Sequence, residues 1–164
     1  MEETLSTTYF SALHDDAFSL LVEARNYIAA LRQQGPAGGG SHTDQLDVTL
    51  ETMRLTTRLT QVMAWVLAQK AVQNLELSAE EGASKRYRLS GQSICLDTEQ
   101  EKAGNLPPQL RDLLQRSHAL YCRVSRLEEQ IGDRLASGET PLPTGEGPYL
   151  RPVTTSDQTP ETAY

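Results

Sequence analysis

The chain has 164 residues and a formal net charge of −7, with a sequence pI of about 5.0. The length predicts one domain with room for an appendage. The acidic balance argues against duplex nucleic acid or an anionic membrane surface as the main partner, because both need a basic protein face. Two cysteines, Cys95 and Cys122, are too few for a disulfide scaffold, so we expect reduced thiols in a soluble cytoplasmic protein.

The first predicted helix spans about residues 8–33, where apolar side chains recur at intervals of three and four. They are Phe10, Leu13, Ala17, Leu20, Leu21, Ala24, Ile28 and Leu31. Gly35-Pro36 is expected to end this helix. The glycine-rich residues 37–42 that follow predict a flexible connector.

The second predicted helix spans about residues 44–74 and contains no Gly or Pro. One stripe at helical spacing consists of Leu46, Leu50, Met53, Thr57, Thr60, Ala64, Leu67 and Ala71. Other apolar residues fall largely off this stripe, namely Val48, Leu55, Leu59, Val62 and Val66. A helix that is apolar on more than one side needs more than one packing partner, so we expect the central member of a bundle.

The connection over residues 78–105 is expected to be partly ordered. Ser78 followed by Glu81 fits a capping box, which predicts a short helix or turn that ends at or soon after Gly82. The stretch that follows is long for a structureless loop inside a compact domain. We expect it to pack through a few apolar residues and to be loose elsewhere. The expected packing residues are Leu89, Ile94 and Leu96.

The third predicted helix spans about residues 107–136, with proline in the first turn, where a missing N–H costs nothing. Its apolar stripe consists of Leu106, Leu110, Leu113, Leu114, Ser117, Leu120, Tyr121, Val124, Leu127, Ile131 and Leu135. Gly132 lowers the stability of the helix by roughly 1 kcal/mol relative to Ala, so we expect the last turns to fray. Gly138 is the expected end of the helix.

After Ser137 the composition changes. Residues 137–164 hold five of the eight prolines and four acidic residues, and Arg151 is their one basic residue. Such a segment has little to bury, so we predict a disordered tail. The predicted fold class is therefore all-α: an antiparallel three-helix bundle over residues 1–136, followed by a disordered C-terminal tail.

The sequence contains no recognisable active site. His14 lies beside two aspartates that could orient it as a general base, but neighbours at i+1 and i+2 on a helix point apart. His42 falls in the glycine linker, and His118 and the two cysteines add no metal-binding signature. The glycines at 38–40 lack the GK[ST] ending of a phosphate loop. We therefore expect no catalysis, no cofactor and no metal.

One candidate protein-binding surface lies on the second predicted helix. It consists of Arg54, Arg58, Gln61 and Trp65. Arginine and tryptophan are enriched at binding hot spots. The alternative is intramolecular: the arginines pair with Glu23 or with aspartates of the first helix, and the tryptophan fills the bundle. The spacing alone does not decide between the two.

Two further candidates lie outside the long helices. Lys85, Arg86 and Arg88 surround Tyr87 and could bind an acidic surface or a nucleotide phosphate, although such a cluster is often only a solvated turn. In the tail, an island of apolar and basic residues could act as a tethered docking peptide. Its candidate binding residues are Tyr149, Leu150, Arg151 and Val153. A chance fluctuation of composition is the alternative.

Three stretches carry a resemblance to a known family. They are ALHDDAFSLLVEARNYI, RLTTRLTQVMAWVLAQKAV and LPPQLRDLLQRSHALYCRVSRLEE. The most specific positions are Arg54, Thr57, Arg58, Gln61, Ala64, Trp65, Gln69, Ala71 and Val72. Over roughly residues 9–130 the chain resembles the alphaproteobacterial family of the regulator of CtrA degradation, RcdA.

The resemblance implies a proteolytic adaptor that delivers cell-cycle regulators such as CtrA to the ClpXP protease. It implies cooperation with a CpdR-like response regulator that engages the ClpX unfoldase, and with a PopA-like cyclic-di-GMP-binding adaptor. It also implies a three-helix bundle that forms homodimers, a tail needed for delivery, and concentration at a cell pole. The wide apolar surface of the second helix separately predicts a homodimer. The rival hypotheses are a structural dimerisation module and a DNA-associated regulator.

Overall fold

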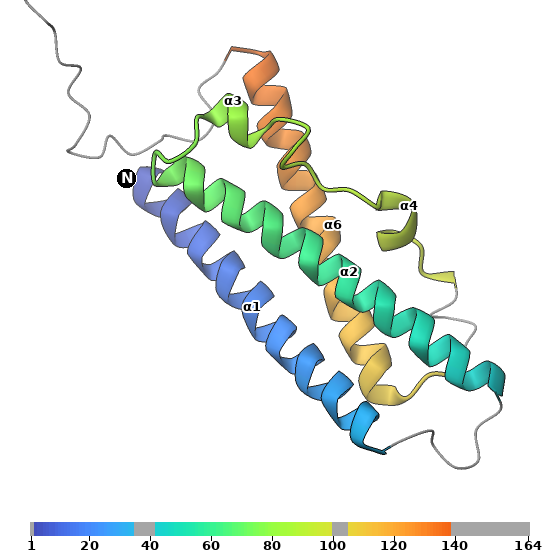
Figure 1. The fold of residues 1–164 in the computed structure, drawn as a ribbon. Helices are drawn as coiled ribbons and strands as arrows, with labels where there is room; N and C mark the ends of the chain where they lie inside the picture. The colour runs from blue at the N-terminus through green and yellow to red at the C-terminus, as the bar shows by residue number, and fades with distance from the viewer. Residues whose placement is uncertain (1, 35–41, 100–104, 139–164) are drawn as a thin grey trace, which may run out of the picture.

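The computed structural model describes residues 2–34, 42–99 and 105–138, and every regular element in these ranges is helical (Figure 1). The long helices are α1 (Glu2–Gln34), α2 (His42–Gln73) and α6 (Pro108–Ala136). Two one-turn helices, α3 (Ala79–Gly82) and α4 (Gln92–Cys95), lie in the connection between α2 and α6. The predicted all-α fold class is confirmed. The tail from residue 139 onward lies outside the described residues.

The helix directions differ in one respect from the prediction. α1 runs antiparallel to both other long helices, whereas α2 and α6 run in the same direction (Figure 1). Ion pairs support this order for α1 and α6, because Arg116 pairs with Glu23 and Arg123 pairs with Asp16. The predicted antiparallel arrangement therefore holds for α1 against each neighbour. The α2–α6 pair is parallel because the long connection 74–107 returns the chain along the bundle.

The hydrophobic core lies among the three long helices, and α2 packs against both others, as expected for a central helix. α1 contributes Phe10, Leu13, Ala17, Leu20, Ala24 and Tyr27. α2 contributes Leu55, Leu59, Val62, Trp65 and Val66, and α6 contributes Leu110, Leu113, Leu114, Leu120, Tyr121, Val124 and Ile131. The core side of α2 is thus the second of its two apolar sets. Its first apolar stripe faces outward.

The helix ends follow local chemistry. α2 closes with Glu76 N–H donating to the Ala71 carbonyl and Leu75 N–H donating to the Val72 carbonyl. Leu75 has a φ of 61°, the left-handed conformation that glycine usually supplies at such a helix end. The capping box predicted at Ser78 is confirmed: Ser78 Oγ accepts from Glu81 N–H at 3.1 Å, and the Glu81 carboxylate accepts from Ser78 N–H at 2.8 Å.

The expected packing of the connection is only partly correct. Leu89 is buried, but Ile94 and Leu96 are 52% and 43% exposed, so the prediction for these two residues is wrong. Cys95 between them is fully buried instead. In the single turn of α4 the inward position falls on Cys95, which turns its two neighbours toward solvent. The connection therefore buries few apolar side chains.

The close approach of α3 to α2 gives a first prediction. A Cβ added at buried Gly82 would collide with Cγ2 of Val72. We expect Gly82→Ala to lower the free energy of unfolding by about 1–3 kcal/mol through overpacking, measured by urea unfolding. Gly132→Ala is the control, because its Cβ would meet only Nη2 of Arg88 at 4.0 Å. The control should be neutral or stabilising by up to about 1 kcal/mol. Equal losses for both variants would contradict the prediction.

Candidate functional site

Two arginines of α2 hold the connection against the bundle. Arg58 is fully buried; its Nε donates to the Cys95 carbonyl at 2.7 Å and its Nη2 to the Asp97 carbonyl at 3.0 Å. Its Nη1 also donates to the Leu114 carbonyl of α6 at 3.3 Å. The same guanidinium thus joins α2, the end of α4 and α6. A buried charge of this kind is stable only when it is fully hydrogen-bonded.

Arg54 extends this network toward solvent. Its Nη1 donates to the Asp97 carbonyl at 2.6 Å, and its guanidinium forms ion pairs with Glu51 at 3.3 Å and with the Asp97 carboxylate at 3.2 Å. Glu51 is only 2% exposed. Hydrogen bonds from Glu99 N–H and then from Arg54 lower the pKa of Asp97 below its usual value. The network therefore consists of charges that already have partners inside the chain.

The other two residues of the predicted binding surface are also used internally. Trp65 is 2% exposed and lies 6.0 Å from Phe10, measured between ring centroids. The Gln61 side chain accepts from Ser90 N–H at 3.0 Å. The structure therefore supports the intramolecular alternative for the stripe Arg54, Arg58, Gln61 and Trp65. The expected ion-pair partners were incorrect, however, because Glu23 pairs with Arg116.

Side chains from α6 complete the attachment of the connection. The Glu128 carboxylate accepts from Leu89 N–H at 2.8 Å, and Tyr121 Oη donates to the Ser90 carbonyl at 3.2 Å. Burial raises the pKa of Tyr121 to about 12, so its hydroxyl remains a donor at neutral pH. Burial also raises the pKa of Glu128. Polar side chains of two helices thus hold residues 89–97.

The remaining sequence candidates are separated in space. Lys85, Arg86 and Arg88 are exposed, and the Arg86 guanidinium lies 5.5 Å from the centroid of the Tyr87 ring. The tail residues Tyr149, Leu150, Arg151 and Val153 lie outside the described residues. His14 is on the surface of α1, where it stacks on Phe18. Within the described ranges, no group of three or more His, Cys, Asp or Glu side chains could hold a metal ion.

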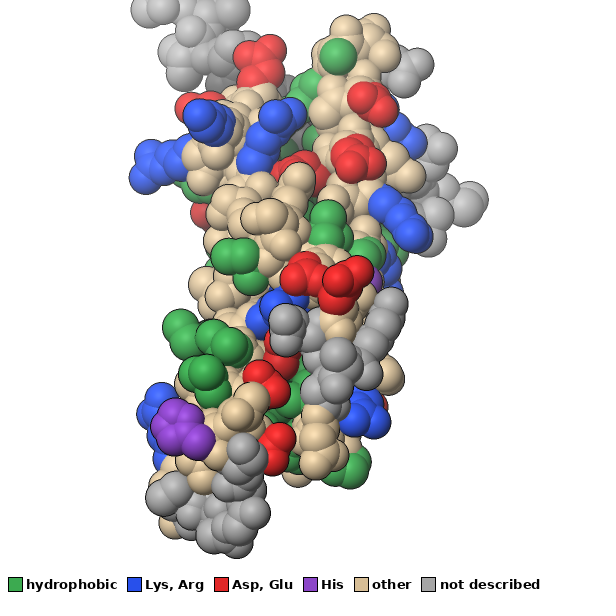
Figure 2. Space-filling view, turned by 90° about the vertical axis from the view of Figure 1, so that its right-hand side faces the viewer, with side chains coloured by type: hydrophobic (Ala, Val, Ile, Leu, Met, Phe, Trp, Pro, Cys, Tyr) green, Lys and Arg blue, Asp and Glu red, His purple; other side chains and the backbone are tan. Residues whose placement is uncertain are grey.

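The largest unexplained feature is the outer face of α2, formed by Leu46, Leu50, Met53, Thr57, Thr60, Ala64 and Leu67. These residues make up most of the first apolar stripe in the sequence. The four large apolar side chains among them are half exposed or more: Leu46 51%, Leu50 51%, Met53 63% and Leu67 50%. Hydrophobic side chains accordingly gather on the surface over the N-terminal half of α2 (Figure 2). Exposed apolar residues that follow one helix face are typical of a protein-binding surface.

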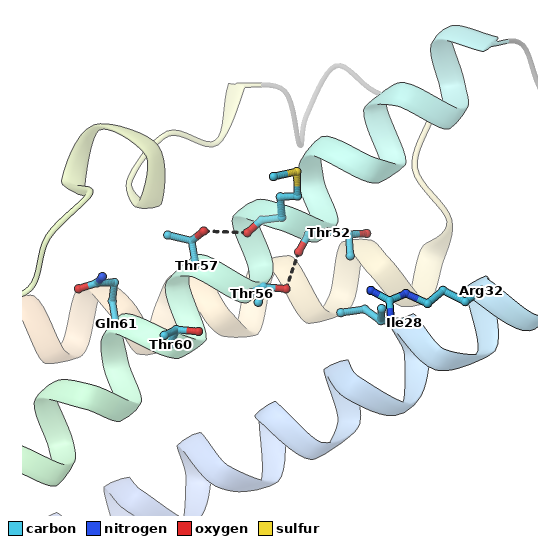
Figure 3. A pocket seen from close by; sticks show the side chains of 8 residues that line it. Ile28, Arg32, Thr52, Thr56, Thr57, Thr60 and Gln61 are labelled. Carbon is cyan, nitrogen blue, oxygen red and sulfur yellow. Dashed lines mark hydrogen bonds between the residues drawn. The ribbon is translucent and has the colours of Figure 1, made fainter.

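A shallow groove of about 400 Å³ borders this face, between α1 and α2 (Figure 3). Its lining residues are Ile28, Arg32, Thr52, Met53, Thr56, Thr57, Thr60 and Gln61. Thr52, Thr56 and Thr57 each donate the hydroxyl proton to the carbonyl four residues earlier, at 2.7–2.9 Å. Because these donors are used inside the helix, the three hydroxyl groups are not free to donate to a ligand, and the polar groups left in the groove include the Arg32 guanidinium. A partner helix could approach closely here.

The comparisons with known proteins agree with the fold. Residues 1–147 match the model of a family described as a protein of unknown function, DUF1465. The crystal structure of RcdA from Caulobacter crescentus CB15 matches with 30% sequence identity and a TM-score of 0.54, over 74% of this chain and 89% of that chain. The chain belongs to the RcdA family. No curated protein matches the chain.

Membership of the RcdA family confirms the resemblance proposed from the sequence. None of the described helices of the present protein is long and apolar enough to cross a membrane.

The arginine network gives a second prediction. Replacing Arg58 by Met should lower the free energy of unfolding by about 3 kcal/mol, because buried carbonyls would lose their donors and a buried charge cluster would lose one member. Urea unfolding measures this loss, and amide hydrogen exchange should accelerate most in residues 89–97. Arg25→Met, at an exposed position of α1, is the matched control and should change stability little. A similar loss in both variants would argue against a structural role for Arg58.

Proposed function

We propose that this RcdA-family protein is a non-enzymatic proteolytic adaptor. It binds cell-cycle regulatory proteins such as CtrA and delivers them to the ClpXP protease, together with a CpdR-like response regulator. The observation that carries the proposal is the 30% identity to RcdA across 89% of the RcdA chain. The exposed outer face of α2 supports a binding role, because it offers an apolar surface on a rigid helix.

The proposal divides the work between the two parts of the chain. The folded bundle binds the cargo, and the segment after Ser137 links the loaded adaptor to the ClpX unfoldase. A PopA-like cyclic-di-GMP-binding adaptor joins when CtrA is the cargo. These encounters take place in the cytoplasm, concentrated at a cell pole. The change of composition after Ser137 supports this division.

Deleting residues 138–164 tests the division. We expect the truncated protein to retain cargo binding and to lose delivery, because α6 ends at Ala136 and the core formed by the described residues lies entirely before the deleted segment. Degradation of purified CtrA by ClpXP and the response regulator measures delivery, and a pull-down measures cargo binding. Normal cargo turnover by the truncated protein would refute the role of the tail. No acceleration by the full chain would refute the adaptor proposal.

We also propose that the protein forms a homodimer through the outer face of α2. The order of side-chain sizes along this face supports an antiparallel pair of α2 helices related by a two-fold axis near Thr57. In that register Leu50 lies opposite Ala64, and Met53 lies opposite Thr60. At these two positions a large side chain meets a small one, which favours close helix packing. The second candidate function, a dimerisation module without a protease link, rests on the same face.

Leu50→Glu tests the dimer. A carboxylate at this half-exposed position should leave the monomer folded, because Leu50 is 51% exposed, and should weaken self-association at least about tenfold by placing an unpaired charge in an apolar contact. Sedimentation equilibrium measures the association constant. Ile94→Glu is the matched control, since Ile94 is 52% exposed but lies on α4. A wild-type chain that remains monomeric at tens of micromolar would refute the homodimer.

A further inference from the structure

The basic turn, defined here as Lys85, Arg86 and Arg88, is a cluster of exposed cations that the proposed function does not use. All three side chains are exposed. Arg54, Arg116 and Arg123, by contrast, each have a carboxylate partner. Among the described residues, no carboxylate lies within ion-pair distance of a basic-turn side chain. The basic turn thus presents three available cations on a chain whose net charge is −7.

The nearby carboxylates of the described chain have other roles. Glu81 of α3 is engaged in the capping box with Ser78. Glu128 of α6 accepts from Leu89 N–H, and the charge of Arg88 counteracts the rise in its pKa that burial causes. Glu80 is exposed and does not pair with the turn. The local carboxylates therefore leave the outward side of the basic turn open to an acidic ligand.

The position of the basic turn indicates where such a ligand comes from. The Arg88 guanidinium lies beside Gly132 of α6. Gly138 follows six residues later, about 9 Å further along a helix axis. The chain leaves the described fold at Gly138, at the end of the bundle where α3 and the end of α6 meet (Figure 1). Gly138, the last described residue, therefore lies at the same end of the bundle as the basic turn.

The charge of this segment is opposite to that of the basic turn. Residues 139–164 contain Glu139, Glu146, Asp157 and Glu161 against Arg151 alone, a net charge of −3. Glu146 is eight residues beyond Gly138, so a fully extended chain would give it a reach of up to about 28 Å from Gly138. Exposed ion pairs are individually weak, but a tether raises the effective concentration of the segment into the millimolar range.

We propose that the acidic segment 139–164 binds the basic turn of its own chain. The contact is electrostatic, exchanges rapidly and weakens with salt. It holds the segment near the C-terminal end of α6 and competes with any partner that binds the same segment. The contact is a property of the chain alone. It does not depend on ClpXP delivery or on self-association, so its failure would leave both of those proposals standing.

Amide resonances of the isotope-labelled full chain test the contact. The tail variant combines four substitutions: Glu139→Gln, Glu146→Gln, Asp157→Asn and Glu161→Gln. They remove the acidic charges of the segment and change no residue of the bundle. We expect the amides of residues 84–88 to shift in this variant. We expect the same shifts in the wild-type chain at about 0.5 M NaCl, where the Debye length is about 4 Å. Salt should then cause little further shift in the tail variant.

Two charge-matched variants locate the contact. Combined substitution of the basic turn, with Lys85→Gln, Arg86→Gln and Arg88→Gln, should abolish the salt-dependent shifts of residues 139–164. Combined substitution of three exposed arginines elsewhere, with Arg25→Gln, Arg111→Gln and Arg126→Gln, should preserve them. Unchanged amides at 84–88 in the tail variant would overturn the proposal. Equal losses in the two arginine sets, or shifts that grow with protein concentration, would also overturn it, since they indicate diffuse attraction or binding between chains.

Discussion

The structure depends on the buried guanidinium of Arg58. Its hydrogen bonds to the Cys95, Asp97 and Leu114 carbonyls connect α2, the segment after α4, and α6. The connection between α2 and α6 buries few apolar side chains of its own, since Ile94 and Leu96 point to solvent. Hydrogen bonds therefore hold this connection in place, whereas hydrophobic packing holds the long helices together. The position of α4 therefore depends strongly on Arg58, with Arg54 as a second donor from the central helix.

A charged centre of this kind favours one arrangement over others. A purely apolar contact tolerates small shifts of one helix along another, whereas three carbonyls from two segments meet one guanidinium at only one register. The surrounding bonds from Arg54, Gln61, Tyr121 and Glu128 restrict the same segment further. The polar side chains on the side of α2 toward α6 therefore form hydrogen bonds within the protein. Its outer face is left as the part of the helix that can meet another protein.

The sequence predicted the helices well but not the roles of the two sides of α2. Periodicity located both apolar sets, yet it could not tell which set faces the core, because both have helical spacing. The set of Leu55, Leu59, Val62 and Val66 contains only aliphatic residues and is buried, whereas Thr60 and Ala64 of the other stripe are exposed. The smaller side chains of that outward stripe were a signal that could have been used. The burial of Arg58 and Trp65 had no local signal, because their partners are distant in the sequence.

The parallel course of α2 and α6 has a consequence for the order of folding. α1 and α2 are neighbours in sequence and can associate as a hairpin while the rest of the chain is still being synthesised. Residues 89–97 can then bond to Arg54, Arg58 and Gln61 of α2. Their bonds to Tyr121 and Glu128 must form later, because these residues belong to α6. The connection is therefore attached in two steps, first to α2 and then to the last long helix.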